Sequence, residues 1–321
     1  MKVLLVTPAP PGSRKGNRIT AVRWARLLRS LGHRVTVAEE YRGQRCDVLV
    51  ALHALRSHPS VVRYRQLHPS APLVVALTGT DLYGDVRTDS DARQSLDFAM
   101  RLVVLQPLGI DALPEHLRDR VRVIYQSVEP PRSTLPHRPG VFEVCVMGHL
   151  RAVKDPLRTA RAGRLLPVSS RVRVLHLGGA LSEDMAEAAR AEETANPRYR
   201  WLGELPRWKA LRLLSRCRLL SLTSHSEGGA NVIGEAVVVG VPVVSSRIAG
   251  SVGLLGADYP GYFPTGDTQA LADLLHRAET DATFYEDLRR RCDALRPLFD
   301  PAHERQAWAD LLAELAPHRQ D

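Results

Sequence analysis

The sequence lacks the marks of several protein classes. Its four cysteines are scattered, without the paired spacing of a disulfide framework or a zinc site, at Cys46, Cys145, Cys217 and Cys292. This favours a reducing cytoplasm and no metal. The longest apolar run, Val237 to Val244, contains Gly240 and Pro242 and is too short to span a bilayer. The opening MKVLLVT indicates a first strand rather than a signal peptide, so we expect no integral membrane association.

Aromatic residues are also scarce, at 5%, whereas basic residues exceed acidic ones by 44 to 35, a formal net charge of +9. An excess of this sign can indicate nucleic acid, an anionic membrane surface or small anionic substrates. The arginines are spread along the whole chain, with few aromatic residues among them to stack on bases. We therefore expect no nucleic-acid partner, and small anionic substrates fit better.

Short β-branched runs alternate with longer helical patterns, which predicts an α/β fold with parallel sheets. Strands are expected in the first half at Lys2–Thr7, Arg34–Ala38, Asp47–Leu52, Pro72–Leu77, Leu102–Leu105 and Val121–Tyr125. The pattern then restarts at Phe142–Met147, Val172–Leu177, Tyr199–Leu202, Leu219–Thr223 and Val241–Ser245. The clearest helical patterns are Ile19–Leu31 and Ser90–Met100, and the chain past Gly266 is expected to be helical.

Residues 129–140, EPPRSTLPHRPG, carry several prolines and no apolar period, which is typical of an inter-domain linker. The sequence therefore predicts a Rossmann-like domain over 1–128, a linker over 129–140, a second Rossmann-like domain over 141–300 and a C-terminal helix over 301–321. Two such domains facing each other make a cleft, and open α/β sheets bind ligands at the carboxyl ends of their strands.

The most informative stretch runs from Leu222 to Ser246, where a strand leads through a Ser/His/Glu loop into Gly228 to Asn231 and then a helix. Glycines allow a close backbone approach, and the helix start presents unpaired N–H groups that suit a pyrophosphate. Glu227 and Glu235 stand on either side of that helix start. Their carboxylates can accept hydrogen bonds from sugar and ribose hydroxyls.

This glutamate spacing, followed by Gly240-Val241-Pro242-Val243-Val244, resembles the donor motif of the retaining GT-B glycosyltransferases, the glycosyl transferases group 1. The resemblance implies a GT-B fold and a hexosyltransferase that uses a UDP-sugar as co-substrate and requires no cofactor. By the same resemblance Glu227 would hold the transferred sugar and Glu235 the ribose. The domain over 1–128 would bind the acceptor, and the domain over 141–300 would bind the nucleotide-sugar donor.

A second match is Met147 to Pro156, at the end of the first strand of the second half. The family pattern is Gly-Arg-Leu, three residues, then Lys, whose two cations neutralise the leaving diphosphate. Lys154 matches, His149 occupies the arginine position, and Arg151 is expected to supply the missing charge. The residues predicted to be catalytic are Lys154, Arg151 and Glu227. Those predicted to bind the donor are Gly148, His149, Gly178, Gly203, Leu205, Gly228, Gly229, Ala230, Asn231, Val232 and Glu235.

The loop after the first strand, residues 10–18, lacks the glycine triplet of a dinucleotide fingerprint, so a nicotinamide dehydrogenase is a poor fit. Its glycines and basic residues at a helix start would cradle a small, highly charged anion, or form a solvated basic loop. Thr80 stands where the family commonly has a histidine, and His53 is interpreted as a packed strand-end residue. The predicted acceptor-binding residues are Gly12, Arg14, Lys15, Gly16, Asn17, Arg18, Thr80 and Asp81.

Several phrases, among them LTGTDLY, VVLQP, VIYQS and SRIAGSVGLLGADYPGYFPTGD, are similar to the selenosugar synthase subgroup of selenoneine biosynthesis. That likeness implies transfer from UDP-N-acetylglucosamine or UDP-glucose to selenophosphate, with formation of a C–Se bond. An ionised selenium nucleophile needs no general base. Two alternatives stay open: a membrane-surface enzyme with a sugar or lipid hydroxyl acceptor, held by the arginines of Ile19–Leu31, and a non-catalytic sugar-nucleotide sensor. The sequence carries no signal for an oligomeric state.

Overall fold

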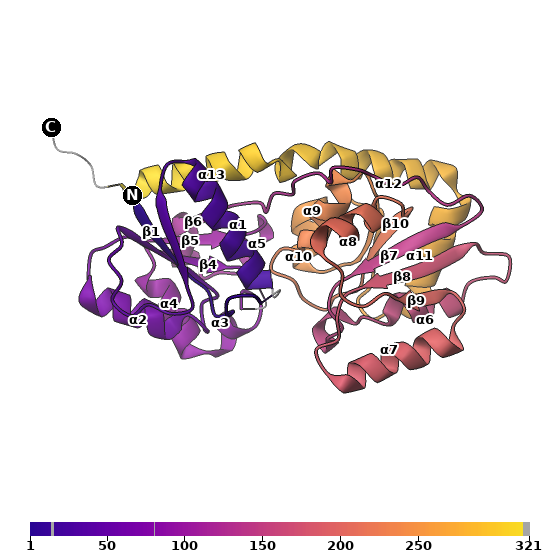
Figure 1. Ribbon diagram of the computed structural model, residues 1–321, viewed down its shortest axis with the longest axis horizontal. Coiled ribbons are helices and arrows are strands. Elements are labelled where there is room, and N and C mark those ends of the chain that lie inside the picture. The colour runs from indigo at the N-terminus through magenta and orange to yellow at the C-terminus, as the bar shows by residue number, and fades with distance from the viewer. Residues whose placement is uncertain (14–15, 80, 317–321) are drawn as a thin grey trace. The chain divides into compact units, whose positions relative to one another are not determined.

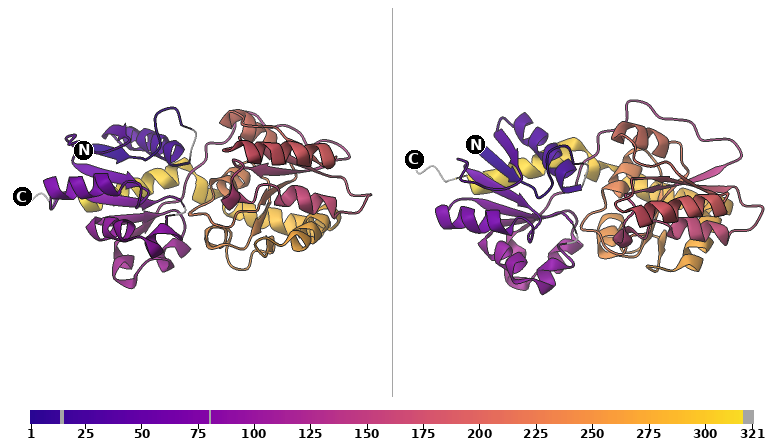
Figure 2. Two further views of the ribbon diagram at one scale, coloured as in Figure 1. Left: turned by 90° about the horizontal axis from the view of Figure 1, so that it is seen from below. Right: turned by 60° about the horizontal axis from the view of Figure 1, so that its bottom comes forward.

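The computed structural model describes residues 1–13, 16–79 and 81–316. The chain forms two compact units: unit 1 contains Met1–Ser127 and the segment that begins at Pro301, and unit 2 contains Val128–Asp300. Each unit is built on its own parallel sheet with helices on both faces (Figures 1 and 2). This confirms the α/β class that the alternation of strand and helix patterns predicts.

The sheet of unit 1 has the strand order β2-β1-β3-β4-β5-β6, and every pairing is parallel. The central strands β3 and β4 are buried at every position, because helices cover both faces and their sequences VLVAL and LVVAL are apolar throughout. The strands are β1 (Lys2–Val6), β2 (Arg34–Ala38), β3 (Val48–Leu52), β4 (Leu73–Leu77), β5 (Arg101–Val104) and β6 (Val121–Val123).

Two helices that are distant in sequence cover one face of this sheet. They are α1 (Gly16–Ser30) and α13 (Pro301–Leu315), which lie beside each other in Figure 1. Trp24 of α1 meets Trp308 of α13 edge to face, with ring centroids 4.8 Å apart. The other face is covered by α2 (His58–Leu67) and α4 (Ser90–Phe98). Short elements complete the unit: α3 (Asp85–Thr88), α5 (Leu108–Asp111) and η1 (Glu115–Arg120).

Glu304 of α13 makes buried polar contacts with the other chain segment of unit 1. Its carboxylate is fully buried and accepts hydrogen bonds from the Trp24 indole N–H at 2.7 Å and from the Ser127 backbone N–H at 2.9 Å. The Arg23 Nε atom lies 3.2 Å from the same carboxylate. A buried carboxylate is stable only with such partners, so this cluster fixes α13 against α1 and the end of the first segment.

The sheet of unit 2 has the order β12-β11-β10-β7-β8-β9, again parallel throughout. Its strands are β7 (Phe142–Met147), β8 (Val172–Leu177), β9 (Tyr199–Trp201), β10 (Leu219–Leu222), β11 (Val243–Ser246) and β12 (Tyr262–Phe263). Its helices are η2 (Ala152–Lys154), α6 (Arg158–Arg164), α7 (Glu183–Ala195), α8 (Arg207–Leu214), α9 (Asn231–Val238), α10 (Ala249–Leu255), α11 (Thr268–Thr280), α12 (Ala282–Ala294) and η3 (Arg296–Phe299).

Every strand expected from the sequence is present, with ends that differ by a few residues at most. β12 was not predicted, because two residues at a sheet edge are too few to show an alternating apolar pattern.

The proline-rich segment 129–140 forms no helix or strand and packs along the end of α8, where the Leu135 N–H donates to Ser215 Oγ at 3.1 Å. Within the described residues, no helix combines the length and apolar character needed to cross a bilayer.

Candidate active site

In both sheets the first strand of the unit lies inside the sheet, with later strands on either side of it. The strand order therefore reverses direction next to that first strand, at a topological switch point. This switch lies between β7 and β10 in unit 2 and between β1 and β3 in unit 1. Open α/β sheets bind ligands at the carboxyl ends of their strands, beside such a switch point. The candidate residues lie on the loops and helices that follow the carboxyl ends of the strands.

Two residues predicted to be catalytic meet at the switch of unit 2. Lys154 follows β7 and Glu227 follows β10, and the Lys154 Nζ atom forms an ion pair with Glu227 Oε1. Ser224 Oγ donates to the same oxygen at 2.6 Å. Both charged side chains keep some exposure, 25% and 13% respectively. A cation and a carboxylate are therefore held side by side, within reach of solvent and of a ligand.

Backbone contacts hold the two loops together without using those side chains. The Thr223 hydroxyl donates to the carbonyl oxygens of Lys154 and Asp155, both at 2.9 Å. The His225 N–H donates to the Val153 carbonyl at 2.8 Å. Asp155 has a left-handed backbone, with φ 43°, and ends the 3-10 turn that carries Lys154. The position of Lys154 is thus set by its backbone, and its ammonium group is available for chemistry.

The second predicted glutamate lies on α9, after the glycine loop. Glu235 is 9% exposed, and its Oε1 lies 3.1 Å from Nε of Arg207, the first residue of α8. Ala230 precedes α9 and offers no side-chain oxygen to cap the first N–H groups of that helix. Gly228, Gly229, Asn231 and Val232 belong to the same loop and helix start, as the sequence predicted. A helix start of this kind can bind an anion.

The predicted glycines of β7, β8 and β9 lie together at neighbouring strand ends. The Gly148 N–H donates to the Leu177 carbonyl at 2.9 Å, and the Gly178 N–H donates to the Gly203 carbonyl at 2.8 Å. His149 is bound into this group, because its Nδ1 accepts the Gly179 N–H at 3.2 Å. Leu205 follows Gly203 and is partly exposed, and Arg151 is exposed next to this group.

Two residues that support this group were missed at the level of sequence. His176 is fully buried in β8, with its Nε2 3.1 Å from the Gly148 carbonyl oxygen. Trp201 Nε1 donates to the Gly178 carbonyl at 2.7 Å. In sequence, a histidine inside an apolar strand and a tryptophan at a strand end read as core residues. The only available signal was the polar ring nitrogen of His176 at a buried position.

Replacing Gly178 by alanine is expected to abolish ordered packing of the Gly148 loop. A Cβ atom at Gly178 would lie 1.9 Å from the Gly148 carbonyl oxygen, and the residue has φ 157°. The Gly148 backbone must therefore move, and we expect the affinity for UDP, the nucleotide that the family resemblance implies, to fall at least about tenfold, or about 1.4 kcal/mol. Titration calorimetry measures this. Gly256→Ala is the control, since its φ is 89° but its Cβ would meet nothing within 4 Å.

The predicted acceptor residues of unit 1 are only partly described. Arg14, Lys15 and Thr80 lie outside the described residues. Gly12 has φ 80° in the exposed loop after β1, and Gly16 begins α1. Asn17 Oδ1 accepts the Thr78 hydroxyl at 2.9 Å, which joins the loop after β1 to the loop after β4. Arg18 follows in the first turn of α1 and is partly exposed.

Asp81 is placed deeper than a surface loop residue. It is fully buried and accepts the backbone N–H groups of Ala54 and Gly79, each at 2.9 Å, so it fixes the loops after β3 and β4. Burial raises the pKa of this carboxyl group, and nearby His53 opposes that shift. His53 is 3% exposed, with Nδ1 3.8 Å from Asp81, which matches its interpretation as a packed histidine. Burial lowers the pKa of His53.

Other strand ends of unit 1 bury polar atoms that have no hydrogen-bond partner in the described structure. They are the Thr7 hydroxyl after β1 and Oε1 of Gln126 after β6. Gln126 Nε2 donates to Thr20 Oγ1 of α1 at 2.8 Å, which orients the amide. Buried polar atoms normally have a partner. These oxygens can therefore accept hydrogen bonds from water or a ligand.

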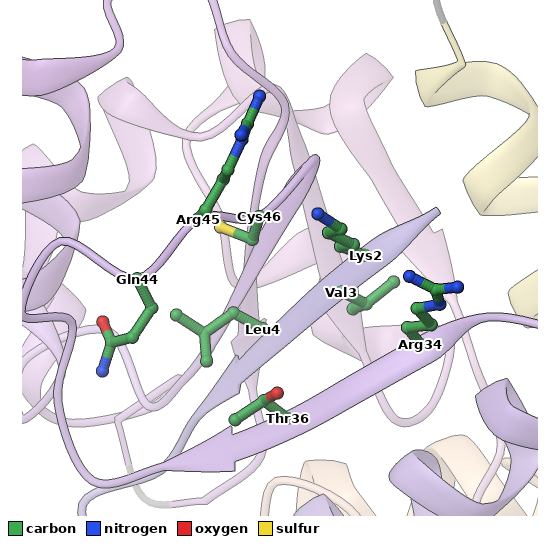
Figure 3. A pocket seen from close by; sticks show the side chains of 8 residues that line it. All are labelled: Lys2, Val3, Leu4, Arg34, Thr36, Gln44, Arg45 and Cys46. Carbon is green, nitrogen blue, oxygen red and sulfur yellow. The ribbon is translucent and has the colours of Figure 1, made fainter.

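Two cavities lie on other parts of the surface. One, of about 220 Å³, lies beside the first residues of β1 and β2, where Lys2 is in register with Arg34 (Figure 3). Because these are the amino ends of the strands, it lies away from the carboxyl ends that carry the candidate residues. The other, of about 630 Å³, lies between residues 129–133 and α8, and Arg207 lines it.

Comparisons with known proteins identify the family and the fold. Residues 130–294 match the family described as "Glycosyl transferases group 1", and no curated protein matches the chain. Anabaena Alr3699/HepE in complex with UDP and glucose has a TM-score of 0.77 at 18% identity, covering 98% of this chain and 100% of that one. The sucrose-phosphate synthase tll1590 of Thermosynechococcus elongatus has a TM-score of 0.79 at 14% identity, covering 98% of both chains. At such identities the likeness confirms the predicted GT-B fold.

Proposed function

Since the chain belongs to the glycosyl transferases group 1 family and is therefore a glycosyltransferase, we propose that unit 2 binds a UDP-sugar and that its sugar passes to selenophosphate. One observation carries the donor assignment: the Lys154–Glu227 ion pair lies at the β7/β10 switch, on the same edge as the glycine-lined strand ends. The HepE structures with UDP and UDP-glucose support a uridine donor.

Lys154 would stabilise the charge that develops on the departing diphosphate. As the bond between the anomeric carbon and the diphosphate oxygen breaks, negative charge accumulates on that oxygen, and a fixed ammonium group lowers the energy of this state. Binding of the diphosphate would draw Lys154 away from Glu227. Ser224 keeps its hydrogen bond to Glu227, so the carboxylate stays in place to accept hydroxyls of the sugar. We assign the second cation to Arg151.

The ribose is assigned to Glu235. Its carboxylate is oriented by Arg207 from the start of α8, so one oxygen has a fixed direction. Its carboxylate oxygens can accept hydrogen bonds from two vicinal hydroxyls. Gly203 and Leu205, at the end of β9, are assigned to the base, and α9 with its preceding glycines to the diphosphate.

Selenophosphate as acceptor is supported by the sequence phrases of unit 1 and by the buried position of His53. His53 is 3% exposed between Asp81 and Asp85, with its pKa lowered by burial, so it is poorly placed to act as a base on a hydroxyl group. An ionised selenium atom needs no such base. It attacks the anomeric carbon, the C–Se bond forms, the C–O bond to the diphosphate breaks, and UDP leaves. Gly12, Arg14, Lys15, Asn17 and Arg18 are assigned to the anionic acceptor.

The lipid-surface alternative loses its main support. The apolar face of α1, with Trp24, Ala25 and Leu28, is buried against the sheet of unit 1. Of its interleaved arginines, Arg23 contacts Glu304, and Arg29 donates to the Val35 carbonyl at 2.7 Å. Membership of a glycosyltransferase family likewise favours catalysis over the sensor alternative.

Mass spectrometry tests the reaction. The protein is incubated with UDP-N-acetylglucosamine or UDP-glucose, and with selenophosphate. We expect UDP and a sugar that carries the selenium isotope pattern, neither formed with inorganic phosphate in place of selenophosphate. Release of UDP only with hydroxyl acceptors would overturn the selenium assignment and leave the donor assignment standing.

A further inference from the structure

His176 is a polar residue at a buried position of a largely apolar strand. It lies in β8, whose sequence VRVLHL is otherwise buried except for Arg173, and its side chain has no exposed surface. A buried imidazole is costly unless both ring nitrogens have partners. Both do: Nε2 lies 3.1 Å from the Gly148 carbonyl oxygen, and Nδ1 lies 2.9 Å from the Tyr199 hydroxyl.

The partners fix the direction of each hydrogen bond. A carbonyl oxygen only accepts, so His176 Nε2 carries the proton and donates it to Gly148. Nδ1 of the neutral ring then accepts the Tyr199 hydroxyl proton. Burial lowers the pKa of His176 to about 4 and raises that of Tyr199, which keeps both groups neutral around pH 7. The chain of donors therefore crosses three adjacent strands, from β9 through β8 to the end of β7.

The bond to Gly148 sets the orientation of the next amide. The Gly148 carbonyl and the His149 N–H belong to one planar trans peptide, so they point in opposite directions. Because the carbonyl is held toward His176 of β8, the His149 N–H points the other way, away from His176. The His149 ring is fixed as well: its Nδ1 accepts the Gly179 N–H, so the proton of the neutral ring is on Nε2.

We propose that His176 is a positioning residue for the donor: by holding the Gly148 carbonyl, it directs the His149 amide at the diphosphate of the UDP-sugar, while the Gly179 N–H holds the His149 ring beside it. This rests on the proposed function. In the family pattern this loop position is an arginine, and here two neutral N–H donors occupy it. Neutral donors depend on direction more than a charged group does, which is why a buried residue has to fix the peptide plane.

The test compares His176→Gln with His176→Leu. The glutamine amide places a donor nitrogen near the position of Nε2 and retains an acceptor, whereas leucine has the right size for the strand but no donor. We expect His176→Leu to weaken UDP binding about tenfold, or about 1.4 kcal/mol, and to raise the KM for the UDP-sugar. His176→Gln should stay within about threefold of wild type. UDP affinity is measured by calorimetry, well below the unfolding temperature of each variant.

A control separates positioning from general stability. Val174→Ala removes buried apolar volume from the same strand, without touching the Gly148 loop, and should lower the Tm while leaving UDP affinity unchanged. Equal UDP affinity of wild type and His176→Leu would overturn the positioning role alone. Equal losses of UDP affinity in His176→Leu, His176→Gln and Val174→Ala would mean that the losses reflect general stability, which also overturns the positioning role. No UDP binding by wild type would overturn the donor assignment and this inference with it.

Discussion

Replacing Lys154 by alanine is expected to lower kcat by about 10²- to 10³-fold while the protein stays folded. The estimate comes from the cost of removing one fixed donor that faces developing negative charge. The loop should survive, because it is held by the carbonyls of Lys154 and Asp155 and the N–H of His225, not by the ammonium group. UDP release from the UDP-sugar, measured at saturating acceptor, reports kcat.

Two further variants test whether the loss of kcat is due to the missing cation at this position. Lys154→Arg keeps a cation beside Glu227 and should recover part of the rate. Lys209→Ala removes an exposed lysine from α8, where its Nζ lies 5.4 Å from the Trp208 ring centroid, and should leave kcat unchanged. Near-normal turnover in Lys154→Ala, with normal UDP affinity, would contradict the assignment of Lys154 to the leaving diphosphate.

Glu304→Ala is expected to destabilise unit 1 by about 3–5 kcal/mol, the usual cost of removing one partner from a buried ionic cluster. The change leaves the Trp24 indole N–H and the Ser127 N–H without their acceptor, and it leaves the Arg23 guanidinium next to an apolar side chain. Glu304→Gln should cost less, because the amide oxygen still accepts one of these bonds.

Denaturant unfolding followed by tryptophan fluorescence measures the loss in a Trp201→Phe, Trp208→Phe background, where the remaining Trp24 and Trp308 both lie in this cluster and report on unit 1. Arg305→Ala, an exposed position on the same helix, is the control and should change the free energy of unfolding by less than about 0.5 kcal/mol. A midpoint for Glu304→Ala equal to that of the control would mean that α13 is held by its apolar contacts alone.

The fold was accessible from sequence because the strands carry a strong local signal. Runs such as VLVAL and LVVAL are apolar at every position, as a parallel sheet covered on both faces requires. β12 escaped because two residues, Tyr262 and Phe263, become a strand only through pairing with β11. The family motifs predicted roles for Lys154 and Glu227, and the structure brings the two side chains together because the loops after β7 and β10 lie near each other once those strands pair.

What the sequence could not show were contacts set by neighbouring strands. His176 reaches Gly148 because β7 and β8 pair in a register that places Met147 opposite Leu177. No pattern along β8 contains that information. Asp81 was read as part of a polar loop, but the structure buries it because the Ala54 and Gly79 amides need an acceptor.

The divided construction of unit 1 sets an order of events during synthesis. Unit 2 is continuous, so residues 128–300 can collapse as soon as they leave the ribosome. The first 127 residues emerge earlier but must wait, with the Trp24 face of their sheet uncovered, until Trp308, Leu311 and Leu312 arrive to cover it. Until residues 301–315 are translated, the nascent chain thus exposes the apolar face around Trp24 to solvent.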